Sequence, residues 1–201
     1  AIDGIDATHL PEHKRAQYIG RVFQDPMMGT AATMQIEENL ALAARRGKAR
    51  GLKAGITASE RKEYRELLKI LDLGLEDRLT AKVGLLSGGQ RQALTLLMAT
   101  LVPPKLLLLD EHTAALDPAT AEKVLSLTQD IVARQNITCL MVTHNMKHAL
   151  DLGTRTLMMD AGRIVLDLSG EERKGLTVED LLSRFRAGAG KDLDNDRILL
   201  S

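Results

Sequence analysis

Three short stretches of the sequence combine residue types that handle phosphate and water. Ser87 precedes two glycines at the start of an amphipathic run, where a capping hydroxyl and unobstructed backbone N–H groups can bind an anion. Asp110 and Glu111 close an apolar run, and adjacent carboxylates at the end of a parallel strand can hold Mg²⁺ and polarise a water for attack on phosphorus. His144 follows the next apolar run and could hydrogen-bond a phosphate or that water, if the two strands are neighbours.

Each stretch also has a plain structural explanation. Ser87 could be an ordinary helix cap, the two acids could be solvated loop residues, and a lone histidine at a strand end is often unremarkable. His144 and His148 are four residues apart, as in some zinc sites. We reject a metal pair, because a strand-to-helix break separates them and no cysteine or carboxylate is spaced to complete the site.

The scaffold predicted for these stretches is an α/β sandwich with mostly parallel strands. β-prone runs cover 18–23 and 137–142, and the continuous apolar run 106–109 is typical of a strand covered on both faces of a sheet. Residues 156–159 and 164–168 flank a turn and predict a hairpin.

Helices are predicted between these strands from capping residues and apolar spacing. The sequence predicts one over 88–101, a long one after Asp117-Pro118, a short one over 146–152, one capped by Thr177, one capped by Thr33, and one that begins at Thr57 and is closed by Gly74.

Composition excludes several classes of protein. The chain has 201 residues, with 27 Lys+Arg against 27 Asp+Glu, 2 Tyr and 2 Phe, so it lacks the basic surplus and stacking platform of a nucleic-acid binder. No apolar run approaches the length of a membrane helix. The single cysteine, Cys139, excludes an internal disulfide and is predicted to be a small core residue.

Taken in order, the motifs resemble the nucleotide-binding domain of ATP-binding cassette (ABC) proteins. Gln24 follows a strand, LSGGQ stands at 86–90, LLLLDE at 106–111, Ala-Leu-Asp at 115–117, and His144 follows Val-Thr. The resemblance covers residues 18 to 163, which is most of the chain.

The resemblance implies an ATPase with a P-loop NTPase-like, mostly parallel sheet and an inserted helical subdomain. Gln24 matches the glutamine that touches Mg²⁺ and the attacking water and senses the membrane subunit. Asp110 matches the aspartate on Mg²⁺, Glu111 the catalytic base and His144 the switch histidine. ATP and Mg²⁺ are the implied cofactors.

The resemblance also implies a head-to-tail homodimer that holds two ATP molecules. Ser87, Gly88, Gly89 and Gln90 match the signature motif, which binds the γ-phosphate of the ATP held by the other subunit. Asp117 matches the aspartate at the dimer seam.

The implied domains are an incomplete ATPase core over 1–26 and 85–170, a helical subdomain over 27–84 that meets a transmembrane partner, and a C-terminal helix with a loose tail over 171–201.

Two departures from the family pattern stand out. No G-x-x-x-x-G-K-[ST] motif occurs, and Gly188 to Lys191 is a decoy, because Asp192 replaces the hydroxyl residue. The phosphate-binding loop is expected before Ala1, so this stretch alone is expected to bind ATP poorly and to be inactive. His112 stands where most members have proline and is expected to be a tolerated loop substitution.

The resemblance is strongest to ATPase subunits of tryptophan/tyrosine-type amino-acid importers. It implies a peripheral protein at the cytoplasmic face of the cell membrane, a permease partner, a substrate-binding protein in the wider complex, and no nucleic acid. Two alternatives stay open: a soluble ABC ATPase of the DNA-repair or translation type, and a truncated cassette that acts only as a dimerisation or docking module.

Overall fold

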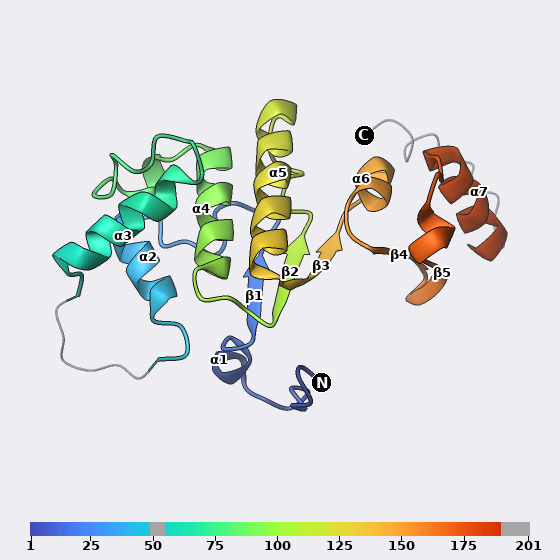
Figure 1. Cartoon of the computed structure of the whole chain (residues 1–201), viewed down its shortest axis with the longest axis horizontal. Coiled ribbons are helices and arrows are strands. Elements are labelled where there is room, and N and C mark those ends of the chain that lie inside the picture. The colour runs from blue at the N-terminus through green and yellow to red at the C-terminus, as the bar shows by residue number, and fades with distance from the viewer. Residues whose placement is uncertain (49–54, 190–201) are drawn as a thin grey trace. The chain divides into compact units, whose positions relative to one another are not determined.

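The computed structural model describes residues 1–48 and 55–189, and its internal contacts divide the chain into two compact units (Figure 1). The first unit is Ala1–Val142, and the second begins at Thr143. The domain boundaries expected from the family resemblance remain a prediction.

A parallel three-stranded sheet forms the centre of the first unit. Its strands are β1 (Ile19–Val22), β2 (Leu106–Asp110) and β3 (Thr138–Val142), in the order β1-β2-β3. Parallel neighbours need a crossover connection, and α4 (Gly88–Thr100) and α5 (Pro118–Gln135) lie in these connections (Figure 1). The predicted α/β class and the parallel pairing of the two central strands are therefore confirmed.

One face of this sheet faces the core of the unit. Leu107 and Leu109 of β2 join the core of the unit, and α4 approaches β1 so closely that a Cβ on Gly20 would lie 2.8 Å from the Ala99 carbonyl oxygen. On the opposite face, Leu140 and Val142 of β3 keep 52% and 51% of their surface exposed. In β2 itself, Leu106 and Leu108 on that face are only partly buried, so among the described residues the strand is fully covered on one face alone.

Helices α2 (Ile36–Ala44) and α3 (Ala58–Lys69) pack together beside α4 (Figure 1). The Arg61 guanidinium donates to both carboxylate oxygens of the buried Glu37, at 2.8 and 3.0 Å, and so joins the two helices. Thr57 caps α3 as predicted.

Two predicted helix ends are wrong. The cap of α2 is Gln35 rather than Thr33, because Gln35 forms a reciprocal capping box with Glu38. Helix α3 ends at Lys69 with Ile70 as its C-cap, before Gly74, because the positive φ of Asp72 has already broken the helical path. Two short elements, α1 (Glu12–Arg15) and the 3-10 turn η1 (Val83–Leu85), carry no pattern long enough to predict.

The second unit is a helix-flanked hairpin. It contains α6 (Met146–Asp151), the antiparallel strands β4 (Arg155–Asp160) and β5 (Arg163–Ser169), the 3-10 turn η2 (Gly170–Arg173) and α7 (Val178–Ala189). The predicted hairpin and its two flanking helices are confirmed.

Hydrogen bonds from Arg173 and close packing at Gly188 hold the elements of the second unit together. Arg173 donates to the carbonyl oxygens of Leu150 and Leu152 at the end of α6, at 2.7 and 3.0 Å. Gly188 lies within α7, where a Cβ would meet the Val165 oxygen at 2.7 Å, so this glycine serves close packing on β5. The decoy motif therefore begins inside a helix, and its remainder lies outside the described residues.

Within 1–48 and 55–189, none of the helices is both long enough and apolar enough to cross a bilayer.

Candidate functional site

The carboxylates Asp110 and Glu111 lie at the carboxyl end of β2, as predicted. Asp110 is the last residue of the strand, and Glu111 takes a left-handed conformation with φ 43°. The Glu111 N–H donates to the Val142 oxygen of β3 at 3.0 Å, which holds this conformation in place. A non-glycine residue in this region is strained by about 1–3 kcal/mol, and such strain clusters at functional positions.

Gln24 comes from the neighbouring strand and meets Glu111. It lies just after β1, and its Nε2 donates to Glu111 Oε2 at 3.2 Å. Because the amide nitrogen faces the carboxylate, the amide carbonyl oxygen is the atom available to a cation. The structure thus brings together Gln24, Asp110 and Glu111 at one sheet edge.

An arginine that the sequence reasoning missed also reaches this edge. Arg21 of β1 makes an ion pair with Asp110, 3.3 Å between Nη2 and Oδ2, with about half of each side chain exposed. Its guanidinium also lies over the Phe23 ring, 4.4 Å from the centroid. Arg21 could have been found from the alternation of side chains along the strands. In the observed register Arg21 pairs with Leu108 and therefore lies on the same face of the sheet as Asp110.

Ser87 caps α4 as predicted. Its Oγ accepts from the Gln90 N–H at 3.2 Å, and Gln90 Oε1 accepts from the Ser87 N–H at 3.1 Å. The N–H groups of Gly88 and Gly89, in the first turn, have no acceptor within the helix. This end of α4 therefore has the geometry of an anion site, with Ser87 exposed.

The signature stretch packs against the start of α5. A Cβ on Gly89 would lie only 2.0 Å from Thr120 Cγ2, and one on Gly88 would be 3.6 Å from Leu116. Asp117 caps α5 by accepting from the Thr120 N–H at 3.1 Å, and hydrogen bonding with Thr120 lowers the pKa of its carboxyl group. The stretches around Ser87 and Asp117 are thus neighbours, which sequence spacing did not reveal.

His112 lies in the turn after Glu111, as expected, and is buried there. It is 2% exposed, and its Nε2 lies 3.1 Å from Thr128 Oγ1 on α5. Because the Thr128 hydroxyl donates to the Val124 oxygen at 2.7 Å, it accepts from His112, which makes Nε2 the protonated nitrogen. This residue anchors the turn after Glu111 to α5, and the expectation that it is a tolerated substitution remains a prediction.

His144 belongs to the second unit, where it lies just before α6. The cap of that helix is Asn145, whose Oδ1 accepts from the His148 N–H at 3.1 Å. Strands β2 and β3 are indeed neighbours. The approach of His144 to Glu111 remains a prediction.

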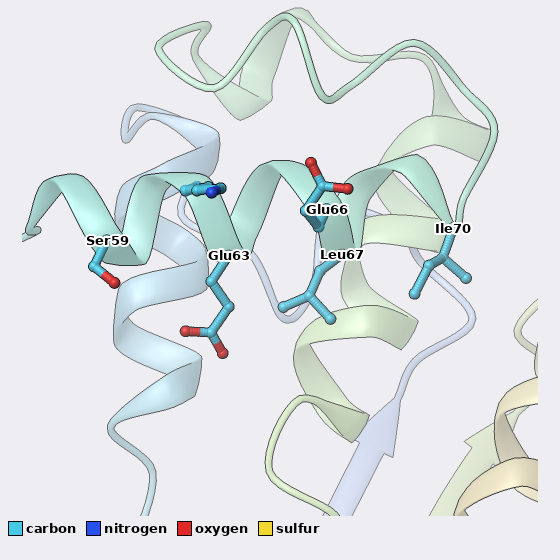
Figure 2. A pocket seen from close by; sticks show the side chains of 6 residues that line it. Ser59, Glu63, Glu66, Leu67 and Ile70 are labelled. Atoms are coloured by element: carbon cyan, nitrogen blue, oxygen red, sulfur yellow. The ribbon is translucent and has the colours of Figure 1, made fainter.

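A shallow hollow along α3 lies apart from these residues. Figure 2 shows the side chains that line it, which come from α3 (Glu63, Glu66 and Leu67 among them) and from its C-cap, Ile70. The lining mixes charges of both signs with two apolar residues and contains none of the predicted site residues.

Comparison with known proteins identifies the family of the chain. The profile of the family described as "ABC transporter" matches residues 1–114, more than half of the chain. The chain is 49% identical to a tyrosine transport ATP-binding protein of Clostridioides difficile, over 92% of this chain and 73% of that protein. The chain belongs to the ABC transporter family.

Other relatives agree. A methionine import ATP-binding protein of Rhizobium johnstonii is 39% identical over 82% of this chain, which spans 43% of that longer protein. A solved dimeric ATP-binding cassette, in a post-hydrolysis state with ADP and Pi, superposes with a TM-score of 0.68 at 30% identity, covering 84% of this chain and 71% of that one. The predicted family, fold class and ABC-type ATPase activity are confirmed by these matches.

Proposed function

We propose that this ABC chain hydrolyses Mg·ATP at the edge formed by Gln24, Asp110 and Glu111, and thereby powers import of a small solute, with an amino acid such as tyrosine as the leading candidate. The observation that carries the proposal is the Gln24–Glu111 contact of 3.2 Å beside the half-exposed Asp110. The 49% identity to a tyrosine transport protein supports the solute class.

Glu111 acts as the general base in this proposal. Its carboxylate takes a proton from the attacking water as the water oxygen bonds to the γ-phosphorus, and the bond from that phosphorus to the bridging oxygen of ADP breaks. Gln24 orients the water through the amide that already meets Glu111. The role of His144, a hydrogen bond to the γ-phosphate, is inferred from the family resemblance alone.

The residues present fit Mg²⁺. This ion usually keeps several waters and takes one or two protein oxygens together with substrate phosphates. Asp110 and the Gln24 carbonyl oxygen are such ligands, and no cluster of three His, Cys, Asp or Glu residues that could hold a metal occurs within 1–48 and 55–189. When bound, Mg²⁺ neutralises charge on the phosphates. Arg21, which now pairs with Asp110, would have to yield part of that contact.

A second copy of the chain completes the site. Ser87, Gly88, Gly89 and Gln90 form an anion-binding helix end with no general base near it in sequence, so we infer that they bind the γ-phosphate held by the partner. Asp117 caps α5, whose Thr120 packs against Gly89, and we infer that it lies at the seam between the two subunits of the dimer. Conformational change driven by hydrolysis is passed to a transmembrane permease, and the protein works at the cytoplasmic face of the membrane. A substrate-binding protein belongs to the wider complex.

The test uses the full-length natural protein with a matched pair of variants. Glu111→Gln abolishes hydrolysis and leaves ATP binding and ATP-induced dimers intact. The control Glu66→Gln, at an exposed position of α3, leaves hydrolysis, ATP binding and dimer formation unchanged. Ser87→Arg blocks hydrolysis and leaves the affinity of the monomer for ATP unchanged. Unchanged turnover in Glu111→Gln would remove Glu111 as the base, and a wild-type protein that binds no ATP would favour the docking-module alternative.

A further inference from the structure

A buried glutamine joins α4 to the residue next to Gln24. Gln92 is 0% exposed and lies on α4, five residues after Ser87. Its Nε2 donates to the carbonyl oxygen of Phe23 at 2.8 Å. Phe23 immediately precedes Gln24, whose own amide meets Glu111 at 3.2 Å. A single hydrogen bond therefore links the helix capped by Ser87 to the residue that precedes Gln24.

The orientation of Gln92 is set by its acceptor. A carbonyl oxygen can only accept, so the amide nitrogen of Gln92 must face Phe23. Its Oε1 is then buried, and it finds no donor among the described residues. An apolar side chain of the same length would avoid this unpaired oxygen but would leave the Phe23 carbonyl without its donor. The specific contribution of the glutamine is therefore the hydrogen bond that it donates to Phe23.

Helix α4 also holds the segment that follows Gln24. Arg91 Nη1 contacts the sulfur of Met27. A Cβ on Gly29 would lie 3.0 Å from Thr95 Cγ2, so the backbone there passes directly over α4. Residues 23–29 thus lie against one helix at three successive points, and a shift of α4 must move them.

We propose that Gln92 is a positioning residue, whose hydrogen bond to Phe23 keeps Gln24 within reach of Glu111 and ties that contact to the helix capped by Ser87. The inference rests on the proposed function. There, Gln24 and Glu111 act on the ATP of this chain, and Ser87 binds the ATP of the partner. Helix α4 is then the rigid link through which occupancy of one nucleotide site adjusts the geometry of the other.

Gln92→Met tests the proposal, because methionine has a similar length and cannot donate. The matched control is Thr100→Val on the same helix. Thr100 is 1% exposed and donates to the Leu96 oxygen at 2.8 Å, so the control also loses one buried hydrogen bond, but far from residue 24. In the full-length protein, Gln92→Met lowers kcat about tenfold, since small misplacements of catalytic groups are costly. The KM for ATP stays within about twofold, as expected for a group that acts after binding.

A second measurement is independent of activity. Hydrogen exchange in the nucleotide-free protein is followed in the peptide that spans 23–29. Gln92→Met speeds exchange there, because Phe23 loses its anchor, whereas Thr100→Val leaves that peptide unchanged. If Gln92→Met yields no folded protein, Gln92→Asn carries the same test, because its amide is one methylene too short to reach Phe23.

The outcomes separate the two proposals. Equal kcat and equal exchange in Gln92→Met and Thr100→Val would overturn the role of Gln92, even if the wild type hydrolyses ATP. A wild type without hydrolysis would overturn the proposed function, while faster exchange of 23–29 in Gln92→Met would still establish the anchor.

Discussion

A tight contact between α4 and α5 at Gly89 yields a quantitative prediction. At Gly89, a Cβ would lie 2.0 Å from Thr120 Cγ2, whereas carbon atoms in contact prefer about 3.5–4.0 Å. Threonine is stiff at χ1, so Gly89→Ala must push α4 and α5 apart or force Thr120 off its rotamer. Such overpacking costs about 1–3 kcal/mol, and removal of a helical glycine returns at most about 1 kcal/mol. We expect Gly89→Ala to lower the free energy of unfolding by about 1–2 kcal/mol.

The compensating change is equally specific. Thr120→Ser removes Cγ2, after which the nearest Thr120 atoms to the new Cβ are Cβ at 3.4 Å and Oγ1 at 3.7 Å. These are ordinary contacts, so the double variant Gly89→Ala/Thr120→Ser should return to within about 0.5 kcal/mol of the wild type. The Thr120 N–H that binds the Asp117 cap is a backbone group and is retained.

The adjacent glycine is the control. A Cβ on Gly88 would lie 3.6 Å from Leu116 Cδ2, so Gly88→Ala should be neutral or slightly stabilising. Urea unfolding followed by tyrosine fluorescence suits the assay, because both tyrosines, Tyr18 and Tyr64, belong to the first unit. Additive effects of Gly89→Ala and Thr120→Ser would refute the steric reasoning, as would an equal loss in Gly88→Ala.

Three further predictions follow from buried or capping groups. Arg61→Met leaves the buried Glu37, which is 2% exposed, without its bidentate partner. The free energy of unfolding, measured in urea, should fall by about 1–3 kcal/mol, which is less than for a fully buried ion pair because half of the Arg61 side chain is exposed. Burial raises the pKa of Cys139 to about 11 from 9.0, so iodoacetamide at pH 8 should label the folded protein about a hundredfold more slowly than the urea-unfolded protein. The hydrogen bond from the Thr57 N–H lowers the pKa of the Glu60 carboxyl group in the folded protein. The ionised Glu60 therefore stabilises α3 at pH values above its pKa in the unfolded chain, and this stabilisation is lost as the pH falls through its pKa in the folded protein. Glu60→Gln should flatten that acid dependence of α3 amide exchange, and an unchanged profile would contradict the assignment.

The strands, most of the helices and much of the family signature were predictable from the sequence. The apolar run before Asp110 predicted β2, Asp117-Pro118 predicted the start of α5, and Ser87 predicted the start of α4, and all three are confirmed. These features are local. A cap or a strand period is set by residues within one turn or a few positions, so the chain order is enough to find them.

Contacts between distant residues needed the tertiary structure. Arg21 and Asp110 are 89 positions apart, Gln24 and Glu111 are 87 apart, and Gln92 lies 69 positions from Phe23. No pattern within a single element predicts such partners, because they depend on which strands pair and in which register. The burial of His112 against α5 was missed for the same reason: it follows from the left-handed turn at Glu111, which turns the chain back toward the core. Residue types and their order thus reveal what chemistry is present, and the packing of α4 and α5 on the sheet decides which of these groups can act on one another.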